Sequence, residues 1–120
     1  MTVLDASALL AFLQDERGSD VVQAALEQRA VCGTANWSEV AQKVISHGRN
    51  WDLAKALLLS FGLGLEAVTV ADAESAARRW KKGSGLSLAD RLCLALGDRL
   101  GLEVLTADSA WSGPGVRQIR

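Results

Sequence analysis

The sequence has few cysteines and histidines, the residues that form disulfides in small proteins or bind zinc. It contains two cysteines and one histidine among 120 residues, and Cys32 and Cys93 are far apart along the chain. With only His47 to join them, they make neither a zinc site nor a disulfide framework, so we interpret both as buried free thiols. There is no tyrosine and there are two phenylalanines, so we expect the four tryptophans to provide core bulk or a dimer contact, with base stacking as the alternative.

Neither charge nor hydrophobicity is concentrated along the chain. Thirteen Lys and Arg against fourteen Asp and Glu give a net charge of −1, so the chain lacks the overall basic field that holds nucleic acids non-specifically. A polyanionic ligand would have to be bound locally or through metal ions. The longest apolar run, 56–65, is too short to cross a bilayer, and no signal-peptide pattern opens the sequence. We therefore expect a cytoplasmic protein.

The remaining composition is that of one folded domain covering residues 1–120, because 49% of the residues are hydrophobic. Helical and strand-like patterns alternate, which predicts a three-layer α/β/α sandwich with a mostly parallel central sheet of four to five strands. The expected strands cover 2–4, 30–33, 65–70, 102–105 and 115–119. The expected helices cover 8–13 after a Ser7 cap, about 20–29 after a Ser19 cap, about 35–46, 51–62 after an Asn50 cap, a segment opened by Asp72, and a long helix begun by Ser87.

Two carboxylates follow expected strands. Asp5 comes directly after residues 2–4, and Asp108 follows the fourth expected strand after Thr106 and Ala107. Because the carboxyl ends of parallel strands share one edge of a sheet, where α/β folds bind ligands, we expect both side chains at that edge. The alternative for Asp5 is a turn or a helix cap.

Two further carboxylates lie in the first turns of helices. Asp90 lies three residues after Ser87, where free backbone amides favour an anion, although the same spacing is typical of a capping box. Glu39 lies among apolar residues early in helix 35–46 and has Lys43 at i+4, so a solvated ion pair is the alternative. If the four acids converge, their mutual repulsion requires cations, and an all-oxygen ligand set favours magnesium or manganese over zinc. Such a site suits a phosphodiester substrate.

Four segments of the chain, Val3–Ala8, Asn36–Val40, Leu86–Arg91 and Val104–Asp108, resemble the acidic motifs of PIN-domain ribonucleases. The order is that of the family and the match covers nearly the whole chain, with most similarity to VapC-type toxins of prokaryotic toxin–antitoxin pairs. The resemblance implies an endoribonuclease dependent on Mg²⁺ or Mn²⁺ that leaves a 5′-phosphate and a 3′-hydroxyl. It also implies a VapB-like antitoxin partner, contact with DNA only through that antitoxin, and a homodimer.

The resemblance also assigns residues to the site. It implies four catalytic acids: Asp5, Glu39, Asp90 and Asp108. It implies three metal ligands among them: Asp5, Asp90 and Asp108. Glu39 would either bind the metal through water or help to position the attacking water. Three polar residues occupy auxiliary motif positions, where they would hydrogen-bond carboxylates or phosphate: Ser7, Asn36 and Thr106. Ordinary roles for these three, as helix cap, first-turn residue and strand end, stay open.

Other features leave alternatives. Arg78, Arg79, Lys81 and Lys82 precede the helix of Asp90 and would track an RNA backbone, or they are ordinary cations near a helix end. A second functional hypothesis is a catalytically weak PIN module that works mainly as an autoregulatory partner of its antitoxin. A third, a response-regulator receiver, is disfavoured because receivers need adjacent acids after the first strand and this chain has one.

Overall fold

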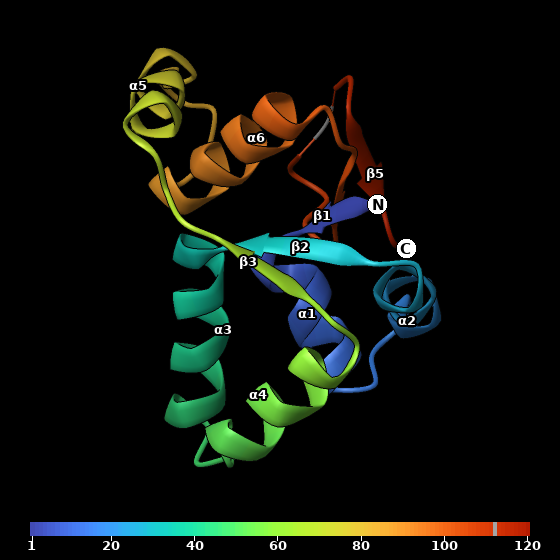
Figure 1. Ribbon diagram of the computed structural model, residues 1–120. Coiled ribbons are helices and arrows are strands. Elements are labelled where there is room, and N and C mark those ends of the chain that lie inside the picture. Colours follow the sequence, from blue (N-terminus) through green and yellow to red (C-terminus); the bar gives the residue numbers. More distant parts are fainter. Residues whose placement is uncertain (112) are drawn as a thin grey trace.

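The computed structural model describes residues 1–111 and 113–120, in which five strands form one parallel sheet (Figure 1). The strands run in the order β3-β2-β1-β4-β5, and every neighbouring pair is parallel. Their bounds are Thr2–Leu4 for β1, Ala30–Gly33 for β2, Gly64–Glu66 for β3, Val104–Thr106 for β4 and Val116–Gln118 for β5. The prediction of a parallel sheet of up to five strands is confirmed.

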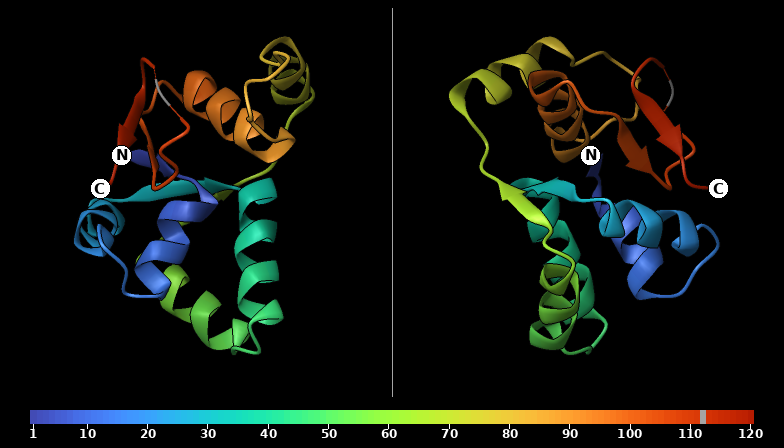
Figure 2. Two further views of the ribbon diagram at one scale, coloured as in Figure 1. Left: turned by 180° about the vertical axis from the view of Figure 1, so that it is seen from behind. Right: turned by 45° about the vertical axis from the view of Figure 1, so that its right-hand side comes forward.

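Helices cover both faces of the sheet (Figures 1 and 2). On one face lie α1 (Ala6–Leu13), α2 (Ser19–Glu27) and the pair α3 (Thr34–Ser46) and α4 (Trp51–Ser60); on the other lie α5 (Val70–Arg78) and α6 (Leu88–Leu100). The predicted three-layer α/β/α arrangement is therefore confirmed. In the described ranges, no helix is both long enough and apolar enough to span a membrane.

The two helical layers pack on opposite faces of the central strands. Val3 pairs with Val104 and packs toward α6, whereas Leu4 pairs with Leu105 and packs toward α1. Successive strand residues point to opposite faces, so a strand covered on both sides must be apolar throughout, as β1 is. Each side of the sheet therefore has its own hydrophobic core.

The two cysteines are buried free thiols, one in each core, as the sequence predicts. Burial raises the pKa of the Cys32 thiol to about 12, and the negative charges of Asp5 and Glu39 add to this effect. The pKa of Cys93 is raised well above its ordinary value for the same main reason. Both cysteines are therefore protonated, apolar packing residues at neutral pH.

Two helix starts differ from the sequence-based expectation. Asp5, not Ser7, caps α1: its carboxylate accepts a hydrogen bond of 2.8 Å from the backbone N–H of Ala8, and the helix begins at Ala6. Gly18, in the left-handed conformation at φ 92°, precedes α2, so Ser19 is the first helical residue rather than the cap. The hydroxyl of Ser7 is thus free of capping and available to bind Asp5.

The third strand is also shorter than expected. It ends at Glu66, and Thr69 caps α5 with a side-chain oxygen that accepts from the N–H of Asp72. Asp72 in turn accepts from the N–H of Thr69, so it completes a capping box inside α5 instead of opening the helix. The cap overrides the apolar run that suggested a strand over 65–70.

Candidate active site

Asp5 lies at the carboxyl end of β1 and is almost completely buried, with 3% of its surface exposed. Besides the N–H of Ala8, two hydroxyls donate to its carboxylate: Thr106 at 2.6 Å, and Ser7 at 2.8 and 2.9 Å from the two oxygens. Each carboxylate oxygen receives two of these contacts, Oδ1 from Ser7 and Ala8 and Oδ2 from Ser7 and Thr106. Asp5 is therefore fixed in orientation.

The same hydroxyls tie Asp5 to the end of β4. The oxygen of Ser7 accepts from the N–H of Ala107 at 2.9 Å, and the oxygen of Thr106 accepts from the N–H of Asp108 at 3.0 Å. A continuous hydrogen-bond network therefore joins the ends of the two central strands. It holds the backbone of Asp108 beside Asp5, as expected of two acids at one edge of a parallel sheet.

Burial dominates the electrostatics of Asp5. It raises the pKa of Asp5 from 3.8 to about 6, with a smaller contribution from the negative charge of Asp90, although the hydrogen bonds from Thr106, Ala8 and Ser7 act in the opposite direction. Ionisation of Asp5 in the folded protein therefore costs free energy, and a nearby cation would offset this cost.

The other acids come from three separate segments. Asp90 lies in the first turn of α6, where one oxygen accepts from the N–H of Ser87 and the Ser87 hydroxyl accepts from the N–H of Asp90. This is the capping box that the spacing indicated. Asp108 is exposed just past β4, and its Oδ1 accepts from the N–H of Ala110.

Glu39 is held by Asn36 and not by Lys43, the ion-pair partner of the alternative interpretation. The side-chain amide of Asn36, 2% exposed, donates to Oε1 of Glu39 at 3.1 Å and to the carbonyl of Ala89 in α6 at 3.4 Å. Among the described residues Glu39 makes no ion pair with Lys43. Asn36 therefore links the carboxylate of α3 to the helix that carries Asp90.

All four acids line one cavity of about 230 Å³, together with Ser7 and Asn36. Thr106, the remaining predicted residue, lies behind the cavity wall and contacts Asp5 from the interior. Besides the apolar Ala6 and Leu10, sequence reasoning missed two polar wall residues, Gln42 and Lys43. Their i+3 and i+4 spacing from Glu39 on α3 was the signal that could have placed them there.

The donor set of this cavity fits a hard divalent cation. It presents carboxylate oxygens from four segments of the chain. Across residues 1–111 and 113–120, no three Asp, Glu, His or Cys side chains are already grouped closely enough to hold a metal ion. The acids thus surround the cavity without any three of them being close together. It is the chemical type of the ligands, all of them carboxylate oxygens, that favours magnesium or manganese.

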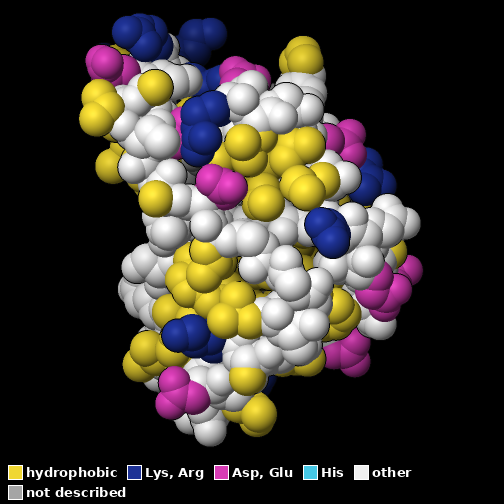
Figure 3. All heavy atoms as spheres, in the orientation of Figure 1, with side chains coloured by type: hydrophobic (Ala, Val, Ile, Leu, Met, Phe, Trp, Pro, Cys, Tyr) yellow, Lys and Arg dark blue, Asp and Glu magenta, His cyan; other side chains and the backbone are white. Residues whose placement is uncertain are grey.

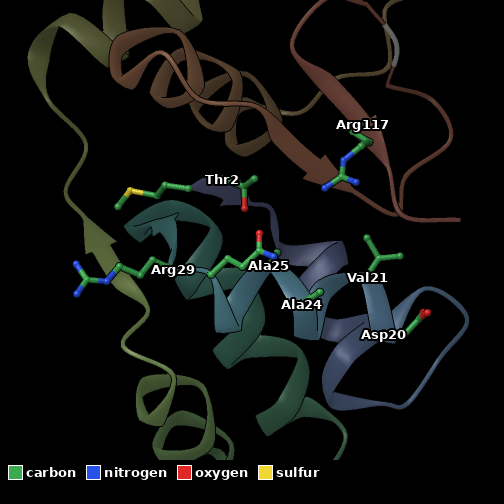
Figure 4. A pocket seen from close by; sticks show the side chains of 9 residues that line it. Thr2, Asp20, Val21, Ala24, Ala25, Arg29 and Arg117 are labelled. Atoms are coloured by element: carbon green, nitrogen blue, oxygen red, sulfur yellow. The ribbon is translucent and has the colours of Figure 1, made fainter.

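A different cavity, of about 380 Å³, lies at the opposite edge of the sheet beside Thr2 (Figure 4). Arg117 and Arg29 extend in different directions in this view, and Arg117 forms an ion pair with Glu103. Among the described residues that line it, Asp20 is the single carboxylate. Its described lining therefore holds no cluster of acids like the one at the other edge.

The chain as a whole matches a known protein family. The model of the PIN domain matches residues 2–114. The chain belongs to the PIN-domain family. A search of curated proteins found no match.

Solved structures resemble this PIN domain over its whole length. A toxin–antitoxin complex from Klebsiella pneumoniae contains a chain with 20% identity and a TM-score of 0.78, and the alignment covers 100% of this chain and 98% of that one. VapC20 of Mycobacterium tuberculosis, described as a toxin that cleaves the sarcin–ricin loop, has 19% identity and a TM-score of 0.69, with 96% and 92% covered. At these identities the likeness establishes the fold.

Proposed function

We propose that this PIN domain is a metal-dependent endoribonuclease and the toxin of a toxin–antitoxin pair. The observation that carries the proposal is the convergence of Asp5, Glu39, Asp90 and Asp108 from four separate segments on one cavity at the carboxyl edge of the sheet. The family match and the toxin-related structural neighbours support the same function.

In this proposal each acid has a role set by its surroundings. Asp5, Asp90 and Asp108 hold Mg²⁺ or Mn²⁺, and Asp5 is the fixed member because three donors orient it. When bound, the ion supplies charge neutralisation for the phosphodiester and the acidity that makes water a nucleophile. Glu39, oriented by Asn36, positions the attacking water and accepts its proton.

The proposed antitoxin has a candidate binding surface beside the acids. A mainly apolar cavity of about 440 Å³ lies between α1, α3 and α4, and Leu10 lines both this cavity and the acidic one. On its α4 side Leu53 is 70% exposed and Leu57 is 45% exposed. Neighbouring apolar side chains that stay exposed mark protein-binding surfaces, so we place the antitoxin here.

A homodimer remains a separate prediction, which light scattering of the purified chain tests.

The nuclease proposal is tested by cleavage of total RNA, with mapping of the 5′ ends of the products. Cleavage by the purified chain should require Mg²⁺ or Mn²⁺ and stop with EDTA. Asp90→Asn should reduce kcat at least about a hundredfold, because a lost ligand removes several kcal/mol of transition-state stabilisation. Glu74→Gln, an exposed position on α5, should retain full activity.

Equal cleavage by Asp90→Asn and the unmodified chain would contradict the role of that carboxylate. A chain that binds its antitoxin tightly but cleaves no RNA with either metal would leave the alternative of a catalytically weak regulatory module.

A further inference from the structure

A further cavity lies between the segment that leads into α6 and the turn that follows β4. This cavity, here called the loop cavity, has a volume of about 330 Å³, within the range of small-ligand sites. Its walls include Lys81, Ser84, Leu86, Leu94, Ala110 and Trp111. The catalytic proposal assigns no role to any of these residues.

Both walls of the loop cavity continue directly into the acidic site. Leu86 precedes Ser87, the cap of α6, so Asp90 lies one helical turn further along. On the other wall, the N–H of Trp111 donates to the carbonyl of Asp108 at 3.2 Å, which closes a turn with these two residues at its ends. The loop cavity is therefore bounded by the same two chain segments that carry Asp90 and Asp108.

The lining has the chemistry of a nucleotide site. Leu86, Leu94 and Trp111 provide an apolar wall suited to the face of a base, whereas Lys81 and Ser84 provide a cation and a hydroxyl suited to phosphate and sugar. Lys81 is exposed, and within the described ranges it makes no ion pair. Its charge is thus available for an external anion.

The adjoining surface extends this chemistry. Arg78 and Lys82 are also exposed and make no ion pair with any described carboxylate, whereas Arg79 is paired with Asp98. Basic side chains gather over the end of α5, at the top left of Figure 3. Trp80 lies among them and is 63% exposed, unlike Trp111, which is 4% exposed. A protein with net charge −1 therefore concentrates free cations and an exposed indole at one place.

We propose that the loop cavity binds a nucleotide of single-stranded RNA next to the cleaved phosphate; this inference rests on the proposed nuclease function. Lys81 contacts the phosphate of that nucleotide, and Leu86, Leu94 and Trp111 contact its base. Trp80 stacks on a base further along the strand. The acids perform the cleavage, and the loop cavity sets where along the RNA the strand is held.

The test measures binding of a fluorescein-labelled pool of random 14-nucleotide RNAs by fluorescence anisotropy in the presence of magnesium. Every variant also carries Asp90→Asn, which prevents cleavage during the measurement. Lys81→Glu should weaken binding at least about fivefold and reduce the slope of log K against log salt by about 0.7. Ala110→Trp adds bulk to the cavity wall without altering charge, so it should weaken binding at least about fivefold with an unchanged slope.

Lys55→Glu on α4 is the matched control, since Lys55 is exposed and lies in the layer on the other face of the sheet. It makes the same charge reversal and should leave binding unchanged. Melting temperatures of all variants verify that they fold. If Ala110→Trp does not fold, Lys81→Glu still decides the test, because it changes an exposed side chain.

The two proposals fail in different ways. If Lys81→Glu and Ala110→Trp bind RNA as Lys55→Glu does, the loop-cavity proposal is overturned, even while cleavage by the unmodified chain depends on magnesium and Asp90. If both variants lose binding as expected but the unmodified chain cleaves no RNA, the loop cavity stands as an RNA site and the nuclease proposal fails.

Discussion

Replacing Asp5 by asparagine should stabilise the metal-free protein at neutral pH. Burial raises the pKa of Asp5 from 3.8 to about 6, so the folded protein binds more protons than the unfolded chain between these values. The free energy of unfolding therefore falls as the pH rises through this range and stays lower above it. At 1.36 kcal/mol for each pKa unit, the charge on Asp5 costs about 3 kcal/mol at pH 7.5.

The amide of Asp5→Asn carries no charge, but one of its two acceptor oxygens becomes a donor that faces Thr106. The altered hydrogen bond offsets about 1 kcal/mol, which leaves a net stabilisation of about 2 kcal/mol at pH 7.5. For a domain of this size that is roughly 8 °C in Tm. At pH 4 most of the wild-type carboxyl is protonated in the folded state, so the difference should largely disappear.

Urea unfolding in EDTA from pH 4 to 8 measures this difference directly. The difference in the free energy of unfolding between a variant and the wild type cancels the contribution of groups that titrate identically in both. The control variant Glu74→Gln should stay within about 0.5 kcal/mol of the wild type at every pH. Magnesium should then raise the Tm of the wild type and leave Asp5→Asn nearly unchanged, because the ion binds the folded carboxylate. An Asp5→Asn variant less stable than the wild type at pH 7.5 without metal would refute the reasoning.

Two further predictions concern the layer formed by α5 and α6. Gly97→Ala should lower the free energy of unfolding by about 1–3 kcal/mol in urea titrations, because a Cβ there would lie 2.7 Å from Cγ2 of Val104; unchanged stability would show that the strand adjusts freely. Arg99→Met should cost about 2 kcal/mol at pH 7, because Arg99 donates at 2.8 and 3.2 Å to the buried carboxylate of Asp72. The hydrogen bonds from Arg99 hold the pKa of Asp72 below 3.8, so this stabilisation should fade as the pH falls below that value, and a difference that persists there would contradict the assignment.

The sequence predicted the parallel sheet well because both faces are covered. Leu4 and Val104 belong to strands whose every residue is buried or nearly so, which gives short continuous apolar runs. The same pattern located Asp5 and Asp108, since each follows the end of such a run. Local periodicity was less reliable at 65–70, where the Thr69 cap decided the outcome through a hydrogen bond that hydrophobicity does not encode.

The hydrogen-bond network was beyond local reasoning. Ser7 and Thr106 are 99 residues apart, yet their hydroxyl oxygens lie 3.1 Å from each other and both contact Asp5. Nothing in either residue's neighbourhood specifies that pairing; it follows from β1 and β4 being adjacent in the sheet. The exposure of Trp80 was likewise unpredictable, because the sequence pattern did not show that α5 ends at Arg78, two residues before Trp80.

The acidic cavity is formed by residues from both helical layers of the protein. Asp5 and Glu39 belong to the layer of α1 and α3, whereas Asp90 belongs to α6 in the other layer. The side chain of Asn36 connects the layers, because it donates both to Glu39 and to the backbone of α6. Loosening either core would therefore separate the acids without altering any of them. A bound cation would bring together carboxylates from both layers, so metal binding and global stability should be coupled in this protein.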